Sequence, residues 1–207
     1  VHEGYGNHDF TGKGSEPVVD SVSLRNPLRR DIVGTAPGRD GHYSWMWDNV
    51  HFVQLNLAPA DSLPPGRRGL DPRRALAFLR RDLAQNVRGT GRPVVLVCHY
   101  GFTRWEERSW WARTGQAALL RAIRDYRVIA ILHGHHHGTA VYRWRGIPVV
   151  NLGSPFYRRF NRDRRGHFTA LRITDTSMLV QDFAWDPARP EAVSGWTSSF
   201  AVVFPLR

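Results

Sequence analysis

The sequence predicts an α/β protein with a mixed sheet or sandwich, and two observations support that class. Between residues 71 and 132, segments with helical periodicity alternate with short apolar runs that are typical of buried strands. After residue 138, β-branched and aromatic segments follow one another with short turns between them. Strand–helix alternation followed by a run of hairpins is expected of an α/β protein with a mixed sheet.

The first part of the chain is expected to form a long loop and then a hairpin. Residues 10–41 are rich in Gly, Ser, Pro and charged residues, which indicates little regular structure. Residues 42–48 and 50–57 are aromatic and β-branched, and they flank the turn residues Asp48 and Asn49. This hairpin is the first pair of strands that the sequence predicts.

The middle of the chain predicts two helices, each followed by a buried strand. Asp71-Pro72, an N-cap residue followed by proline, predicts the start of a helix that ends near Val87. The apolar residues 93–98 predict a strand, and a second helix leads to another strand at 128–132. Residues 100–113 form an aromatic-rich loop, which either walls a pocket or packs on the core.

The last third of the chain predicts strands alone. Residues 139–144 and 147–152 flank Arg145-Gly146 and indicate a hairpin. Further strands are expected near residues 167–174, 178–185 and 199–204. With no internal repeat in the sequence, the chain is not expected to be a solenoid or propeller.

Length and composition limit the class of protein. A chain of 207 residues with 42% hydrophobic content suits one domain with a sizeable core. No apolar stretch approaches the roughly 20 residues that a helix needs to span a bilayer. The lone Cys98 rules out an internal disulfide framework. Cytoplasmic and exported locations both stay open, because the chain is expected to begin inside a domain and so shows no native leader.

The strong positive charge has two interpretations. A net charge of +11 is a feature of proteins that bind nucleic acid. Lys13 is the only lysine among 29 basic residues, and this arginine excess is more typical of a GC-rich coding sequence than of selection for phosphate contacts. The densest basic patch consists of Arg158, Arg159, Arg162, Arg164 and Arg165. We interpret it as a solvated loop, with steering of an anionic substrate as the alternative.

Three polar clusters carry candidate chemistry. The turn Gly6-Asn7-His8-Asp9 offers an amide oxygen and places an imidazole next to a carboxylate. His99 follows one apolar strand, and Gly134-His135-His136-His137 follows the next. In an extended segment, His135 and His137 would share one side. Each cluster alone is more typical of a turn or strand end, but together they suit zinc, iron or manganese.

The order Gly-Asn-His-Asp, His, Gly-His-x-His resembles the last three motifs of the calcineurin-like metallophosphoesterases, over essentially the whole chain. The resemblance implies a β-sandwich flanked by helices, with two divalent or trivalent ions (Mn, Fe or Zn) at its edge. It implies that Asn7, His99 and His135 bind one ion and His137 the other. His8 would protonate the leaving group of a phosphate mono- or diester, with Asp9 supporting it. Two ions about 3.5–4 Å apart can activate a water and clamp the phosphoryl oxygens.

The start of the chain departs from the family pattern. The family places Asp-x-His and Gly-Asp-x-x-Asp motifs upstream, and these supply most ligands of the first ion and the carboxylate that bridges both. Here only Val1–Tyr5 precede Gly6, and His2 and Glu3 do not match those motifs. We therefore expect residues 1–207 to be a single phosphoesterase domain that lacks its first strand–helix units, and to be weakly active or inactive as they stand.

Two alternatives stay open beside the hydrolase. A non-catalytic basic domain would bind nucleic acid or an anionic surface strongly and in a salt-dependent manner, without metal. A mononuclear remnant would hold one ion on Asn7, His99 and His135 without turnover. Metal stoichiometry separates these three functions. Nucleic-acid binding is the less favoured of them, and the sequence does not indicate an oligomeric state.

Overall fold

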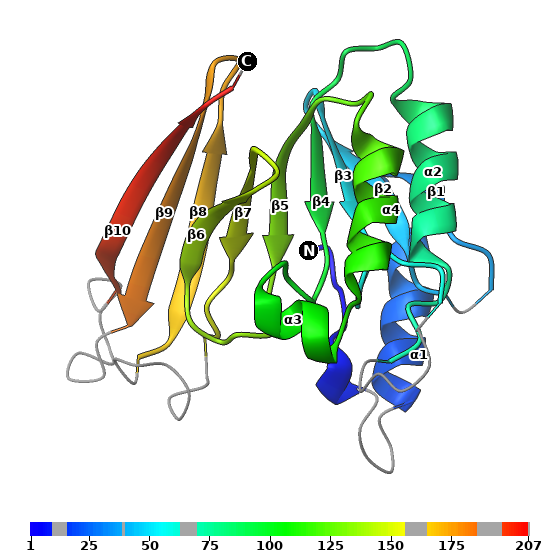
Figure 1. Ribbon diagram of the computed structural model, residues 1–207, viewed down its shortest axis with the longest axis horizontal. Helices are drawn as coiled ribbons and strands as arrows, with labels where there is room; N and C mark the ends of the chain where they lie inside the picture. Colours follow the sequence, from blue (N-terminus) through cyan, green and yellow to red (C-terminus); the bar gives the residue numbers. More distant parts are fainter. Residues whose placement is uncertain (10–15, 39, 63–69, 156–164, 186–195, 207) are drawn as a thin grey trace. The chain divides into compact units, whose positions relative to one another are not determined.

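The structure is a computed structural model that describes residues 1–9, 16–38, 40–62, 70–155, 165–185 and 196–206. The chain forms two units, Val1–His133 and Gly134–Arg207 (Figure 1). Helices and a mixed sheet both occur, so the α/β class expected from the sequence is confirmed. No helix among the described residues is long and apolar enough to cross a membrane.

Five strands of a mixed sheet form the centre of the first unit, in the order β1-β2-β3-β4-β5. β1 (Ile32–Thr35), β2 (Tyr43–Trp47) and β3 (Val50–Gln54) are antiparallel neighbours, and β2 with β3 is the expected hairpin. β4 (Val94–Val97) runs parallel to β3, and β5 (Val128–His133) runs parallel to β4. Parallel neighbours need long crossover connections, so the chain between these strands carries helices.

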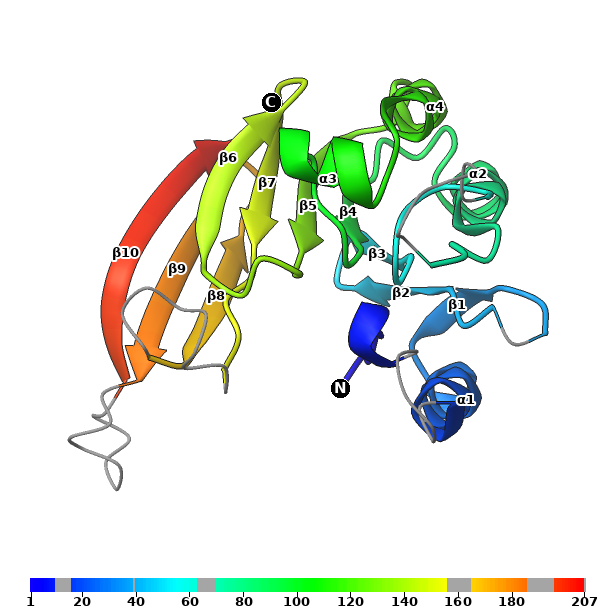
Figure 2. The same ribbon diagram turned by 60° about the horizontal axis from the view of Figure 1, so that its bottom comes forward.

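The helices of the first unit lie on both faces of this sheet (Figure 2). α2 (Ala75–Asn86) joins β3 to β4, and α4 (Arg113–Ile123) joins β4 to β5 after the short α3 (Arg104–Ser109). α2 and α4 lie on one face, whereas α1 (Glu16–Arg25) lies on the other. The 3-10 helix η2 (Asn26–Leu28) follows α1 directly. The apolar residues of these helices pack on the sheet and form the core of the unit.

The expectation that residues 10–41 form a loop is wrong for most of the residues that the structure describes there, because α1, η2 and β1 lie within this range. Val19 and Val22, three residues apart on α1, are buried and form the packing face of the helix. Two valines among serines and charged residues are too weak a periodic signal to reveal a helix. β1 depends on its pairing with β2, which local composition does not encode.

The first crossover helix, α2, begins later than Asp71-Pro72 predicts. The Asp71 carboxylate accepts a hydrogen bond from the backbone N–H of Arg73 at 2.9 Å, which makes a turn and not a helix cap. Arg73 and Arg74 then take left-handed φ angles of 51° and 58°, which end that turn. The helix itself starts at Ala75 and reaches Asn86, close to the expected end.

The second unit consists of a hairpin and a three-stranded sheet. β6 (Ala140–Trp144) and β7 (Ile147–Asn151) form the expected hairpin around Arg145 and Gly146, which both have positive φ. An antiparallel sheet in the order β10-β9-β8 contains β8 (His167–Ile173), β9 (Ser177–Trp185) and β10 (Trp196–Pro205). Burial alternates along β9, so one face of this sheet is packed and the other is more open.

A buried carboxylate ties α2 to the sheet of the first unit. Asp82, which is 2% exposed, accepts hydrogen bonds from Ser44 Oγ on β2 at 2.5 Å and from Asn86 Nδ2 at 2.8 Å. His51 on β3 binds its other oxygen at 2.6 Å and is fully buried. A buried charge is tolerated only when it is paired and hydrogen-bonded, and these three groups meet that requirement.

Replacement of this carboxylate should destabilise the first unit strongly. Asp82→Ala removes the acceptor of three groups and leaves His51 buried without its partner, so the free energy of unfolding should fall by about 3–5 kcal/mol. Urea denaturation measures this change. Asp125→Ala is the control, because the Asp125 side chain is 79% exposed in its ion pair with Arg124, and its loss should cost under about 1 kcal/mol. Equal losses in both variants would contradict the role of Asp82.

Candidate functional site

Two of the predicted metal ligands, Asn7 and His99, lie together in the first unit. They are 92 residues apart in the sequence, yet Asn7 Oδ1 is 2.7 Å from His99 Nε2. Asn7 begins the 3-10 helix η1 (Asn7–Asp9), and its side chain is buried. His99 lies two residues after the end of β4. The structure therefore brings one amide oxygen and one imidazole nitrogen to a common point, and both are ligand types for zinc, iron and manganese.

A glycine makes this approach possible. A Cβ atom at Gly6 would lie 2.5 Å from Cε1 and 2.7 Å from Nδ1 of the His99 ring, closer than real Cβ contacts come. The turn is closed by Asp9, whose carboxylate accepts a hydrogen bond from the Gly6 N–H at 2.8 Å. His8 projects from the same turn and is exposed. Of the motif residues, Asn7 therefore lies beside His99, Asp9 closes the turn, and His8 is exposed to solvent.

Asn56 holds the two segments together, and sequence reasoning missed it. Its side-chain oxygen accepts a hydrogen bond from the Tyr5 N–H at 3.3 Å, and its backbone oxygen accepts one from the His99 N–H at 2.5 Å. Asn56 is fully buried, and its φ of 53° is a left-handed value that asparagine tolerates better than most residues. An asparagine near the end of the predicted strand 50–57 was the available signal.

The N-terminal segment is fixed by further polar contacts. The Tyr5 hydroxyl donates to the backbone oxygen of Asp40 at 2.7 Å, and burial raises the pKa of Tyr5 to about 12, so it remains a donor. His2 binds Asp31 at 2.7 Å and stacks on Trp45 with ring centroids 4.1 Å apart. Burial lowers the pKa of His2, although Asp31 opposes this effect. His2 therefore serves as part of the packing.

Glu3 is also engaged in structure. Its carboxylate binds Arg25 at 2.8 Å and Arg29 at 3.0 Å. Hydrogen bonding to Arg25 is the main cause that lowers the pKa of Glu3. Because both oxygens are taken by guanidinium groups, Glu3 anchors η2 and α1 to the N-terminal segment, in agreement with its mismatch to a ligand motif.

An open cleft of about 270 Å³ lies beside His99. It is lined by His2, Gly4, Tyr5, Gly6, Gln54, Asn56, Val97, Cys98 and His99. Burial raises the pKa of the Cys98 thiol well above its usual range, so Cys98 stays protonated and is neither a nucleophile nor a thiolate ligand. The polar groups that face the cleft are consequently amides and imidazoles, which can bind or orient an anion or a cation.

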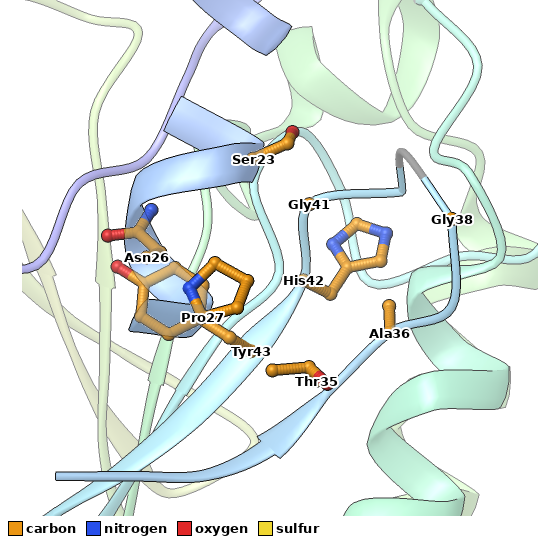
Figure 3. Close-up of a pocket in the computed structure, with 9 residues that line it drawn as sticks. All are labelled: Ser23, Asn26, Pro27, Thr35, Ala36, Gly38, Gly41, His42 and Tyr43. Atoms are coloured by element: carbon orange, nitrogen blue, oxygen red, sulfur yellow. The ribbon is translucent and has the colours of Figure 1, made fainter. Parts of the chain in front are cut away.

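A smaller pocket lies between α1, η2 and the first two strands (Figure 3). Its volume is about 20 Å³, which is room for one water and not for a substrate. Its lining residues are Ser23, Asn26, Pro27, Thr35, Ala36, Gly38, Gly41, His42 and Tyr43. This pocket belongs to the packing of the first unit.

The aromatic residues 100–113 mostly pack on the core. Tyr100, Phe102 and Trp111 are at least 93% buried, whereas Trp105 is 49% exposed. The segment is not wholly a loop, because it contains α3, whose N-cap Thr103 accepts a hydrogen bond from the backbone N–H of residue 106. Of the two interpretations that the sequence left open, packing on the core describes most of this segment.

The remaining predicted ligands, His135 and His137, belong to the second unit. Their φ angles of 72° and 61° are left-handed, so the expectation of an extended segment with both side chains on one side is wrong. Two such residues cost about 1–3 kcal/mol each and persist only where the surroundings enforce them. The Ser154 N–H donates to the His137 carbonyl at 2.8 Å, and Asn151 Nδ2 donates to the Gly138 carbonyl.

The donor atoms at Asn7 and His99 are of types that bind a metal ion, but two donors are fewer than a complete site needs. Among the described residues, no group of three or more His, Cys, Asp or Glu side chains is arranged to hold a metal. Asn7 and His99 supply one oxygen and one nitrogen within the first unit.

Most of the basic patch, namely Arg158, Arg159, Arg162 and Arg164, lies outside the described residues, while Arg165 is half-buried.

Comparison with known proteins gives matches among solved structures. No family model and no curated protein matches the chain. A provisionally assigned 5′-nucleotidase from Staphylococcus aureus, in complex with alpha-ketoglutarate, overlaps 98% of this chain and 38% of its own, with 17% identity and a TM-score of 0.43. A predicted phosphoesterase from Streptococcus pneumoniae overlaps 73% and 96%, with 10% identity and a TM-score of 0.35.

Vps29 from Chaetomium thermophilum also matches, with 11% identity and a TM-score of 0.33. The overlap covers 46% of this chain and 49% of the Vps29 chain, so the chain spans about half the length of that protein. All these TM-scores lie below 0.5 and all identities below 25%, and the likeness concerns the fold alone. The function proposed below therefore rests on the residues of the chain itself.

The contact between Gly6 and His99 can be tested by a double-mutant cycle. Gly6→Ala places a methyl group against the His99 ring, so the free energy of unfolding should fall by about 1–3 kcal/mol. In a His99→Ala background the ring is gone and most of this penalty should disappear. Urea denaturation of the four proteins measures the coupling, and an equal penalty in both backgrounds would show that the two residues do not meet.

Proposed function

We propose that the protein is a metal-dependent hydrolase of phosphate mono- or diesters. The observation that carries this proposal is the convergence of Asn7 Oδ1 and His99 Nε2 to 2.7 Å from positions 92 residues apart. The order of the motifs in the sequence points to both residues as ligands of the same ion. Their meeting supports the motif assignment.

The proposal assigns a role to each motif residue. Asn7, His99 and His135 are ligands of one ion, and His137 is a ligand of a second. The ions, Mn, Fe or Zn, supply positive charge for the phosphoryl oxygens and an acidic water when they are bound. The donor set suits these ions because it combines imidazole nitrogen with amide oxygen.

The other motif residues act on protons and on position. His8 is exposed on the turn that holds Asn7, so its imidazole can reach a leaving group that enters from solvent. The Asp9 carboxylate accepts a hydrogen bond from the Gly6 N–H, and by fixing the turn in this way it supports His8. Gln54 lines the neighbouring cleft, and its side-chain amide is a donor group that can orient the ester.

The alternative functions have weaker support. Nucleic-acid binding rests on the net charge of +11 alone. The mononuclear remnant shares Asn7, His99 and His135 with the hydrolase, and differs from it in binding one ion without turnover. Metal stoichiometry and hydrolysis of bis-nitrophenyl phosphate, measured on the same preparation, separate all three.

Loss of a ligand should remove metal binding. His99→Ala and His135→Ala should each lower metal affinity by more than the roughly 10–100-fold that follows loss of a residue that hydrogen-bonds to a ligand. His136→Ala is the matched control, since it lies between the proposed ligands and has no assigned role. Elemental analysis after dialysis measures the bound ions. Unchanged metal content in either ligand variant would contradict the assignment.

His8→Ala should give a different result, because a general acid matters only when the leaving group needs a proton. Metal content should stay near that of the unmodified protein, while hydrolysis of esters with alkoxide leaving groups should fall by about 10²–10⁴-fold. Hydrolysis of nitrophenyl esters should fall far less, since nitrophenolate leaves without protonation. An equal loss on both kinds of ester would assign His8 to metal binding or structure.

A further inference from the structure

The second unit contains a buried carboxylate for which the proposed chemistry has no use. Asp182 on β9 is 1% exposed. One of its oxygens accepts hydrogen bonds from Thr139 Oγ1 at 2.8 Å and Thr169 Oγ1 at 3.2 Å, and the other binds His167 Nδ1 at 2.8 Å. A buried carboxylate is costly unless it is paired, and here its partners come from β8 and from the segment just before β6.

Thr139 links this carboxylate to the histidine loop, defined here as Gly134–Gly138. Thr139 follows the loop directly, and His137, with its left-handed φ of 61°, is two residues earlier. Such a backbone conformation is unfavourable for a residue with a side chain and must be held by its surroundings. The hydrogen bond from Thr139 fixes the point at which the chain leaves the loop.

A second route joins the carboxylate to the loop through His167. The side chain of His167 binds Asp182, and its backbone N–H donates to the Ser154 carbonyl at 3.0 Å. The Ser154 N–H in turn donates to the His137 carbonyl at 2.8 Å. These residues are closely packed, because a Cβ atom at Gly153 would lie 2.5 Å from Thr139 Oγ1 and 2.6 Å from Cβ of His167.

We infer that Asp182 is a positioning residue, which holds the histidine loop in its left-handed conformation through Thr139 and through His167 and Ser154. Asp182 binds Thr139, Thr169 and His167, none of which is a proposed ligand. It acts by fixing the backbone on both sides of His137. The conformational role stands on the second unit alone, and only its consequence for metal binding rests on the proposed function.

Two threonines provide a matched pair of variants. Thr139 and Thr169 are both half-buried, and both donate to the same oxygen of Asp182, but Thr139 alone adjoins the histidine loop. Valine replaces each hydroxyl by a methyl group of similar size. If Asp182 positions the loop, Thr139→Val should release it and Thr169→Val should not, even where both variants lose similar stability to urea.

Amide hydrogen exchange in the metal-free protein is the primary measurement. In Thr139→Val, the Ser154 and Gly138 amides, which donate to His137 and His136, should exchange about tenfold faster or more, as expected for loss of a hydrogen bond to a charged group. Asp182→Asn should show the same change. Thr169→Val should leave these amides protected. Thr139→Ser keeps the hydroxyl, so these amides should remain protected in that variant. It also serves as the test if the valine variant does not fold.

The second measurement is Zn²⁺ affinity by titration. Thr139→Val should weaken it by roughly 10–100-fold, and Thr169→Val should not. Equal exchange in the two valine variants, no change in either, or a serine variant that behaves like valine would overturn the inference. If exchange changes as expected but even the unmodified protein binds no Zn²⁺, the result contradicts the proposed function. The positioning role of Asp182 would then still hold.

Discussion

The candidate site depends on one buried asparagine. The side-chain oxygen of Asn56 holds the backbone at Tyr5, and its main-chain oxygen holds the backbone at His99. These two segments have no direct link in sequence, and their polar groups would be costly to bury unpaired. Asn7 and His99 meet where both segments are fixed on the same residue.

The two units use the same device with different partners. In each, a buried aspartate binds one histidine through one oxygen and a hydroxyl through the other: His51 and Ser44 at Asp82, and His167 and Thr139 at Asp182. In the first unit the carboxylate joins a helix to a sheet. In the second it joins strands to a loop. In both clusters the carboxylate is hydrogen-bonded through both of its oxygens, and such buried polar contacts specify one arrangement of elements more sharply than apolar contacts do.

Sequence patterns predicted the elements whose signals are local. The strands at 94–97 and 128–133 are continuous apolar runs, and the hairpin around Asp48 has turn residues between aromatic strands. The sequence therefore predicts these strands and this hairpin correctly. α1 was missed because only Val19 and Val22 mark its buried face. The conformation of His137 was missed because a left-handed φ is enforced by contacts from Ser154, which lies outside the motif. Asn56 was missed for the same reason, since its partners are distant in sequence.

The cluster at Asp82 contains serine, aspartate and histidine, the residue types of a nucleophilic hydrolase, and its connectivity shows why residue types alone mislead. In a catalytic triad the histidine stands between the serine and the carboxylate, so that it can take the serine proton. Here Ser44 and His51 each bind the carboxylate directly, on different oxygens. Both side chains are completely shielded from solvent. A template search based on composition would therefore assign covalent catalysis to a cluster that no ester can enter.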